Sequence, residues 1–214
     1  MAPRDAASMG EAMKTKWAAA VLAAALVTGC AGVTTGVSAS GQGDAFASGA
    51  RGYGVARTAA QADDAAYRQI ETLVQGELAR RGFDAQPLAD ARYRLSIAYA
   101  TQPGAVAASA EQCGGAQAAC VSVDGPAPAL PFVGKVYRHM LTLRFVDAKT
   151  GADVYQVSAS LRDRQPDARQ AAPALVRGAL AKLPFDTGGW LVKTKKDDAG
   201  GMPGVVSVKP ADAR

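Results

Sequence analysis

The chain has 214 residues and a formal net charge of +5, and 49% of its residues are hydrophobic although only 6% are aromatic. This length suits a targeting segment followed by one ordinary domain with a modest core. Because lysine and arginine are dispersed among acidic residues and form no basic stripe, the composition argues against nucleic acid as a partner.

Residues 1–29 are predicted to be a signal peptide. A basic start is followed by an apolar run over 18–27, which is too short to remain in the membrane as a spanning helix. The segment is therefore expected to be removed. Residues 1–12 carry acidic side chains that are unusual in such a start, so translation from Met1 and translation from Met13 both stay open.

The run Leu26-Val27-Thr28-Gly29-Cys30 resembles the lipobox of bacterial lipoproteins, in which the cysteine thiol receives diacylglycerol. The resemblance implies cleavage before Cys30 and anchoring by acyl chains such as palmitate. In lipoproteins an Asp directly after this cysteine retains the protein in the inner membrane, whereas this chain has Ala31-Gly32. The resemblance thus implies an outer-membrane anchor facing the periplasm. Three acyl chains, at about 0.8 kcal/mol per buried methylene, would make that anchor permanent.

Residues 30–52 are rich in glycine, serine, threonine and alanine, which predicts a tether from the lipidated cysteine. An early edge strand over 33–40 is an option within it. The folded domain is predicted over 53–190.

A helix is predicted to begin at Thr58. Thr58 and Gln61 have the spacing of a capping box, and Asp63 and Asp64 place negative charge in the first turn. Gly82 is predicted to end this helix as a left-handed cap. Apolar side chains recur between these points at helical spacing, namely Tyr67, Ile70, Leu73, Val74 and Leu78.

Three strands are predicted from alternating apolar and polar residues. The first covers 93–99 and is stopped by Pro103. The other two, over 137–145 and 155–161, form an antiparallel hairpin around a turn at 147–151.

The stretch 101–134 separates the first two strands and is predicted to be an irregular loop insertion. Its cysteines, Cys113 and Cys120, form an even pair in an oxidising compartment, and glycines between them let the chain turn back. A disulfide is therefore predicted, which the loop-entropy estimate values at roughly 2 to 3 kcal/mol. A metal site would need more ligands and a redox pair favours closer spacing, so both alternatives are weaker.

A second helix is predicted after Pro166 and Asp167, with Pro173 in its first turn and Pro184 at its end. Beyond it, residues 191–214 show no periodicity and are predicted to be a disordered tail.

Each helix has one apolar stripe and each strand one apolar face. The fold class predicted from this pattern is α+β, a two-layer sandwich in which two helices pack on one face of an antiparallel sheet.

Four segments of the chain recur in one order in a known family: Phe46 to Tyr53, Glu77 to Phe83, Ala89 to Ala91, and Phe145 to Gly151. Together they resemble the domain-of-unknown-function family numbered 4136, lipoproteins of Gram-negative bacteria, over about 46–185. The chain departs from the family where Trp is frequent, carrying Val55 and Tyr155, and in its cysteine-bearing insertion. The family has no established reaction, so the resemblance implies fold and location only.

His139 is the only histidine and the obvious candidate for a general base. It lies on the inward face between Tyr137 and Leu141, where a lone histidine usually has a structural role. Asp63 and Asp64 are adjacent on a helix and point about 100° apart, so they do not form a catalytic pair. Because no nucleophile, metal or phosphate motif accompanies them, we predict no catalytic, cofactor-binding or metal-binding residues.

The sequence favours a non-catalytic protein that contacts other envelope components through its sheet or its insertion. The alternative is a carrier that binds a small or lipidic ligand between sheet and helices, and an enzyme is a third class. An exposed edge strand or a flat patch favours the first class, whereas an enclosed apolar pocket favours the second. Lys193 to Lys196 could touch anionic headgroups, but Asp197 and Asp198 beside them favour a solvated tail.

Overall fold

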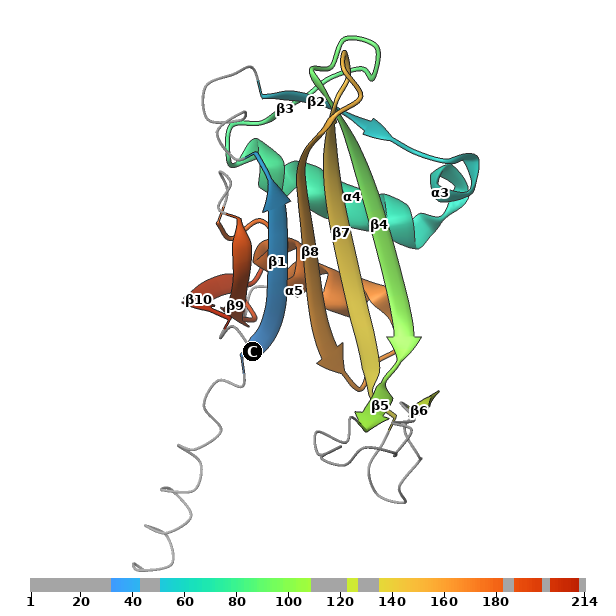
Figure 1. Cartoon of the computed structure of the whole chain (residues 1–214), viewed down its shortest axis with the longest axis vertical. Helices are drawn as coiled ribbons and strands as arrows, with labels where there is room; N and C mark the ends of the chain where they lie inside the picture. The colour runs from blue at the N-terminus through green and yellow to red at the C-terminus, as the bar shows by residue number, and fades with distance from the viewer. Residues whose placement is uncertain are drawn as a thin grey trace, which may run out of the picture. The chain divides into compact units, whose positions relative to one another are not determined.

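A large mixed sheet organises the chain from Val33 onward (Figure 1). The computed structural model describes residues 32–42, 51–108, 123–126, 135–182, 187–197 and 201–211. Eight strands lie in the spatial order β10-β9-β1-β8-β7-β4-β2-β3. Their bounds are β1 (Val33–Gly41), β2 (Gly52–Ala56), β3 (Asp84–Ala85), β4 (Tyr93–Pro103), β7 (Tyr137–Asp147), β8 (Asp153–Asp163), β9 (Gly188–Lys195) and β10 (Gly204–Pro210).

The α+β class is confirmed, but the prediction of a purely antiparallel sheet is wrong. β2 runs parallel to both β3 and β4, whereas the other neighbours pair antiparallel. The reason is the connection between them. Helices follow β2 and carry the chain back before β3 and β4 begin, and a strand reached through such a crossover runs in the original direction.

The first predicted helix is divided in two, α3 (Ala59–Asp63) and α4 (Ala65–Ala79). The capping box of Thr58 and Gln61 is present and starts α3. Asp64 does not add charge to that first turn but acts as the N-cap of α4, because its side chain accepts from the first backbone N–H groups of α4. Gly82 has φ +77°, which confirms the predicted left-handed position after α4.

The second predicted helix is α5 (Ala168–Ala179), which begins directly after Asp167, and the side chain of Asp167 is its N-cap. Pro173 lies inside this helix and not in its first turn. The helix also ends before Pro184, since Leu180 already has a non-helical backbone and serves as the C-cap.

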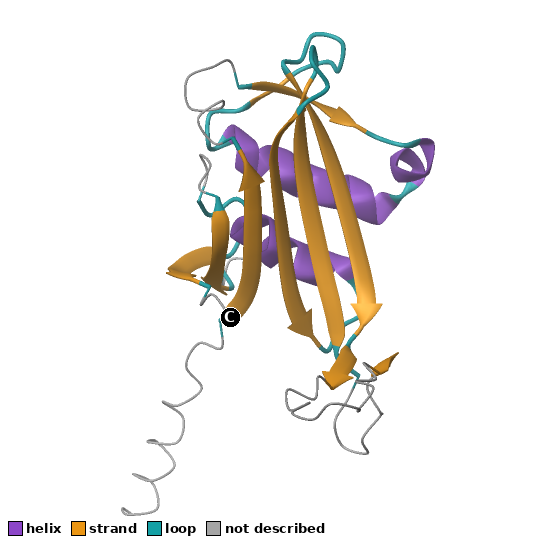
Figure 2. Ribbon diagram, in the orientation of Figure 1, coloured by secondary structure: helices purple, strands orange, loops and turns teal. Residues whose placement is uncertain are grey.

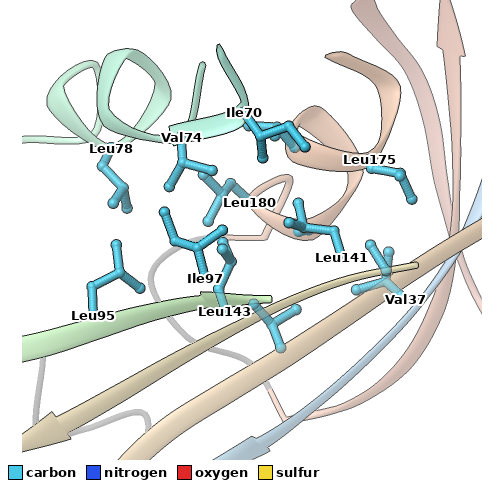
Figure 3. Close-up of a cluster of buried hydrophobic side chains, with 14 of the residues drawn as sticks. Val37, Ile70, Val74, Leu78, Leu95, Ile97, Leu141, Leu143, Leu175 and Leu180 are labelled. Carbon is cyan, nitrogen blue, oxygen red and sulfur yellow. The ribbon is translucent and has the colours of Figure 1, made fainter. Parts of the chain in front are cut away.

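The core lies between these helices and the long strands. Figure 2 shows α4 and α5 behind the strands, and α5 contacts α4, β1, β7, β8 and β9. Figure 3 shows side chains of α4, of α5 and its C-cap, and of β1, β4 and β7 meeting in one cluster, labelled Val37, Ile70, Val74, Leu78, Leu95, Ile97, Leu141, Leu143, Leu175 and Leu180. The periodic positions of both helices and of the predicted strands thus supply the buried residues.

Both ends of the predicted domain need correction. The segment 30–52, predicted to be a tether, contains β1, which lies inside the sheet between β8 and β9 rather than at an edge. The segment 191–214, predicted to be a disordered tail, contains part of β9 and all of β10. Trp190, Val192 and Thr194 are buried at every second position of β9. The apolar Leu191 on the exposed side and the polar Thr194 on the buried side hide this alternation from a search for apolar periodicity.

The insertion is not wholly irregular. A separate two-stranded sheet forms between β5 (Ala105–Ala108) and β6 (Val123–Pro126), with Ala108 opposite Val123. Cys113 and Cys120 lie outside the described residues, as do Cys30 and the signal peptide, so the disulfide and the lipidation stay predictions.

Candidate functional site

His139 lies on β7 with its ring fully buried among polar groups. Its Nδ1 is 2.6 Å from the hydroxyl of Tyr99 and 3.0 Å from Oγ1 of Thr101, both on β4. Its Nε2 is 3.0 Å from Oδ1 of Asp163 and 2.8 Å from the carbonyl oxygen of Gln165. The inward orientation predicted for His139 is therefore confirmed.

These partners fix the tautomer of His139. A carboxylate and a carbonyl oxygen can only accept hydrogen bonds, so Nε2 carries the hydrogen and donates to Asp163 and Gln165. In the neutral imidazole, Nδ1 then accepts from the hydroxyl of Tyr99. Thr101 in turn donates to the Tyr99 oxygen at 3.3 Å. Every polar atom of the buried ring is satisfied.

The order hydroxyl, imidazole, carboxylate is also the order of a catalytic triad, but two features favour a structural role. Burial raises the pKa of Tyr99, with Asp163 and Asp167 adding to the rise against the lowering hydrogen bond from Thr101, so the phenol stays protonated rather than becoming a nucleophile. Neither of the two hollows described below is lined by Tyr99 or His139. The cluster instead joins β4 and β7 to the segment between β8 and α5.

A second buried polar centre forms around Glu77 on α4. Its carboxylate is fully buried and is surrounded by three guanidinium groups, those of Arg80, Arg81 and Arg177. Arg177 comes from α5, lies 2.5 Å from Oε1 of Glu77, and also donates to the carbonyl oxygen of Pro203 at 2.8 Å. This centre therefore joins α4, α5 and the segment before β10.

On each strand, the residues between the core positions point to the opposite face of the sheet, here called the outer face. A groove crosses this face. Its volume is about 260 Å³, and it spans β7, β8, β1 and β9. Small residues such as Gly36, Ser158 and Ser160 form its floor, while Met140 and the half-exposed Leu191 stand beside them. The hydroxyls of Thr142 and Ser158, 3.0 Å apart, satisfy each other there.

This groove was not predicted from the sequence. The signal was present, because the positions between the inward residues of the strand 155–161 are Gln156, Ser158 and Ser160, which are uncharged, whereas charged residues are usual on a solvated face. Only the pairing of β8 with β1 places Gly36 beside Ser160 and joins these small residues into one floor.

A second hollow of about 410 Å³ lies where β2, β4 and the turn after β7 meet. Arg92, Arg94 and Lys149 line it together with Gln86, the acidic Asp90 and the neutral residues beside it. Of the three cations in this lining, Arg92 is paired with Asp147 at 2.9 Å, whereas Arg94 and Lys149 have no ion pair among the described residues.

Within the described residues, no helix has the length and apolar character needed to cross a membrane.

Comparison with known proteins identifies one family. The sequence model of a family described as domain of unknown function (DUF4136) matches residues 37–185, about as far as the sequence motifs suggested. No curated protein matches the chain significantly.

Among solved structures, the PelC dodecamer from Paraburkholderia phytofirmans is similar at 16% identity, with a TM-score of 0.40, over 71% of this chain and 99% of that one. A PDZ domain protein from Parabacteroides distasonis is similar at 11% identity, with a TM-score of 0.39, over 83% of this chain and 42% of that one. Both likenesses are too distant to support an argument on function.

Proposed function

From the premise that this chain belongs to the DUF4136 family, we propose that it is an outer-membrane-anchored periplasmic lipoprotein that contacts another envelope component without catalysing a reaction. The anchor part of this proposal rests on Cys30 at the end of a lipobox and a short apolar run. The contact part rests on the groove of the outer face.

The proposal includes the two-layer arrangement expected from the sequence. The inward positions of the strands share one core with α4 and α5, so the helices cover that face. The outer face then remains for contacts. Most strand positions over the groove are small or polar, although Arg138, Met140 and Leu191 also line it, so a partner can approach the sheet closely.

The groove suits an extended protein segment better than a small ligand. It is partly open to solvent, and its volume of about 260 Å³ falls below the roughly 300 to 1,000 Å³ of enclosed ligand pockets. Its floor of small residues admits a side chain or strand of the partner, and Met140 and Leu191 offer apolar contact beside it. These features favour a protein contact over the carrier function.

The groove is tested by site-specific photocrosslinking in intact cells. A photoreactive residue at position 160, on the groove floor, is expected to capture one dominant envelope protein. The same residue in place of Gln69, on the exposed side of α4, is the matched control and is expected to capture none. Capture of a lipid or small molecule from position 160 alone would favour the carrier, and identical products from both positions would contradict a specific contact.

The anchor is tested by fractionation of the Cys30→Ser variant. Loss of the thiol removes the only atom that can take the diacylglycerol, so the variant is expected to leave the membrane fraction. A variant that still sediments with outer membranes in high salt would overturn the lipoprotein assignment.

A further inference from the structure

The start of β1 fixes which end of the sheet faces the anchor. Only Ala31 and Gly32 separate Cys30 from Val33. Three Cα steps of about 3.8 Å each keep the two residues within about 11.4 Å of each other. A lipid on Cys30 would therefore hold the first residues of β1 next to the headgroups of the membrane.

Several strand ends lie at this same end of the sheet. β1 runs antiparallel to β8, with Gly36 opposite Ser160, so the last residues of β8 lie near the start of β1. β7 begins beside them, since Tyr137 lies opposite Asp163. β9 ends there too, because Thr194 pairs with Val33. Figure 1 shows β1 starting where β7 starts and β8 ends.

This end of the sheet is rich in exposed cations, which we call the anchor-end basic surface. In the described part of the chain, none of its members has a recorded carboxylate partner within salt-bridge distance. The members are Lys135, Arg138, Arg162, Arg164, Lys193 and Lys196.

Two of these cations are placed against each other. Arg138 on β7 lies directly opposite Arg162 on β8, and both are exposed on the outer face. Like charges in directly opposite positions of an antiparallel pair destabilise a sheet. Farther along the same strand, Arg144 is instead paired with Asp153, with its Nη2 2.7 Å from the carboxylate. The unfavourable arrangement is thus specific to the end that faces the anchor.

Two acidic residues at this end have partners outside the surface. Asp163 is engaged by His139, and Asp167 is paired with Arg169. Three of the exposed large apolar side chains, Val33, Val205 and Val206, also lie at this end, because Val205 pairs with Thr194 next to Val33.

We propose that the anchor-end basic surface docks on the anionic phospholipid headgroups of the lipid leaflet that holds the Cys30 anchor, and so orients the domain on the membrane. The orientation rests on the proposed anchor, whereas the affinity of the surface for anionic phospholipid does not. Phosphates between Arg138 and Arg162 would remove their repulsion, and the exposed valines would lie at the headgroup boundary.

The affinity is measured with mature chain carrying Cys30→Ser, which has no lipid, by cosedimentation with vesicles. We expect binding to phosphatidylglycerol vesicles, little binding to phosphatidylcholine vesicles, and release by salt. The double substitution Arg138→Gln and Arg162→Gln is expected to weaken binding roughly tenfold or more, by the usual contribution of a basic residue near an anionic membrane. Arg94→Gln with Lys149→Gln removes equal charge at the far end and should change binding little.

Thermal melts exclude misfolding as the cause, because removing a like-charge pair should leave the Tm of the double variant unchanged or raised. Equal binding to both kinds of vesicle, or equal weakening by the two double variants, would overturn the docking surface.

The orientation is measured on lipidated protein anchored in the same two kinds of vesicle, with an amine-reactive reagent and mass spectrometry. Lys135, Lys193 and Lys196 are expected to react several-fold more slowly in phosphatidylglycerol than in phosphatidylcholine, and Lys149 equally in both. Equal reactivity of all four lysines would contradict the orientation while leaving the anchor intact. Absence of acyl chains on Cys30, with vesicle binding of the unlipidated chain preserved, would instead contradict the anchor alone.

Discussion

The Glu77 and His139 centres satisfy a buried polar side chain in different ways. Both side chains are fully or almost fully enclosed. Glu77 is an anion held by three guanidinium groups from two helices, whereas His139 is held by hydroxyls, a carbonyl and one partly exposed carboxylate. The first centre depends on charge compensation and the second on hydrogen-bond geometry.

This comparison shows that a residue type's rarity in the sequence does not indicate how much that residue contributes to stability. His139 attracts attention because it is the only histidine, whereas Glu77 is one of 19 acidic residues. Yet removal of Glu77 leaves Arg81 and Arg177, whose side chains are mostly buried, without their counter-charge, whereas Arg80 is exposed to water. The expected stability effects therefore rank opposite to the prominence of the two residues.

The largest effect is expected for Glu77→Ala. Removing one side of a buried ion cluster typically costs about 3 to 5 kcal/mol, because the remaining charges are left uncompensated. Denaturant unfolding measures this loss, and Gln69→Ala, on the exposed side of α4, is the matched control. A loss as small as that of the control would show that water compensates the charges of the arginines. The Glu77 centre would then not contribute more to stability than the His139 centre.

A smaller loss, about 2 to 3 kcal/mol, is expected for His139→Ala, since its partners include neutral groups and a carboxylate that can turn to water. Any cellular phenotype of the protein should persist. Thr101→Val, which removes one hydroxyl from the same cluster, should cost less. Loss of function with an unchanged Tm would instead revive the enzyme class and make His139 its first candidate.

A pH-dependent effect is expected for Asp147→Asn, at the turn between β7 and β8. Hydrogen bonds from the backbone N–H groups of Thr150 and Lys149 hold the pKa of Asp147 below its usual value, and Arg92 adds to this. A lowered folded-state pKa stabilises the protein above the unfolded pKa, and the contribution is lost as pH falls through the folded pKa. The Tm difference between wild type and variant should therefore be present at pH 7 and shrink in acid. A constant difference would assign the effect to geometry rather than charge.

The smallest effect on stability is expected from reduction of the predicted Cys113 to Cys120 disulfide. The strands that flank this segment, β5 and β6, pair only with each other and not with the large sheet. Reduction should therefore leave the main thermal transition almost unchanged, although loop closure alone is valued at roughly 2 to 3 kcal/mol. Thiol counting in denaturant with and without reductant tests the bond itself. Two free thiols in periplasmic protein would show that the disulfide is absent. A large fall in Tm on reduction would show that the insertion is part of the cooperatively folded core.

The elements that could be predicted from the sequence are those whose information is local. Thr58, Gly82 and Asp167 each mark a helix end through the hydrogen bonds or the backbone angle of that residue type. The strands 93–99 and 137–145 show clean alternation, and both were found, although each extends further than predicted.

The elements that were missed depend on distant partners. β9 has a polar Thr194 at one of its inward positions, and it is stable because it pairs with β1 on one side and β10 on the other. The parallel direction of β2 follows from a crossover rather than from its own residues. The groove and the anchor-end basic surface likewise need the register of neighbouring strands, which no single segment of sequence specifies.

The position of β1 inside the sheet has a consequence for the order in which the chain can fold. β1 is made early during synthesis, but its neighbours β8 and β9 come much later, and the hydrogen bond from Thr194 to the carbonyl oxygen of Val33 spans 161 residues. Such non-local pairing makes folding slow and leaves β1 without partners until most of the chain has emerged. A chain truncated before Gly188 would keep the family-matched region yet expose one edge of β1, a template for aggregation.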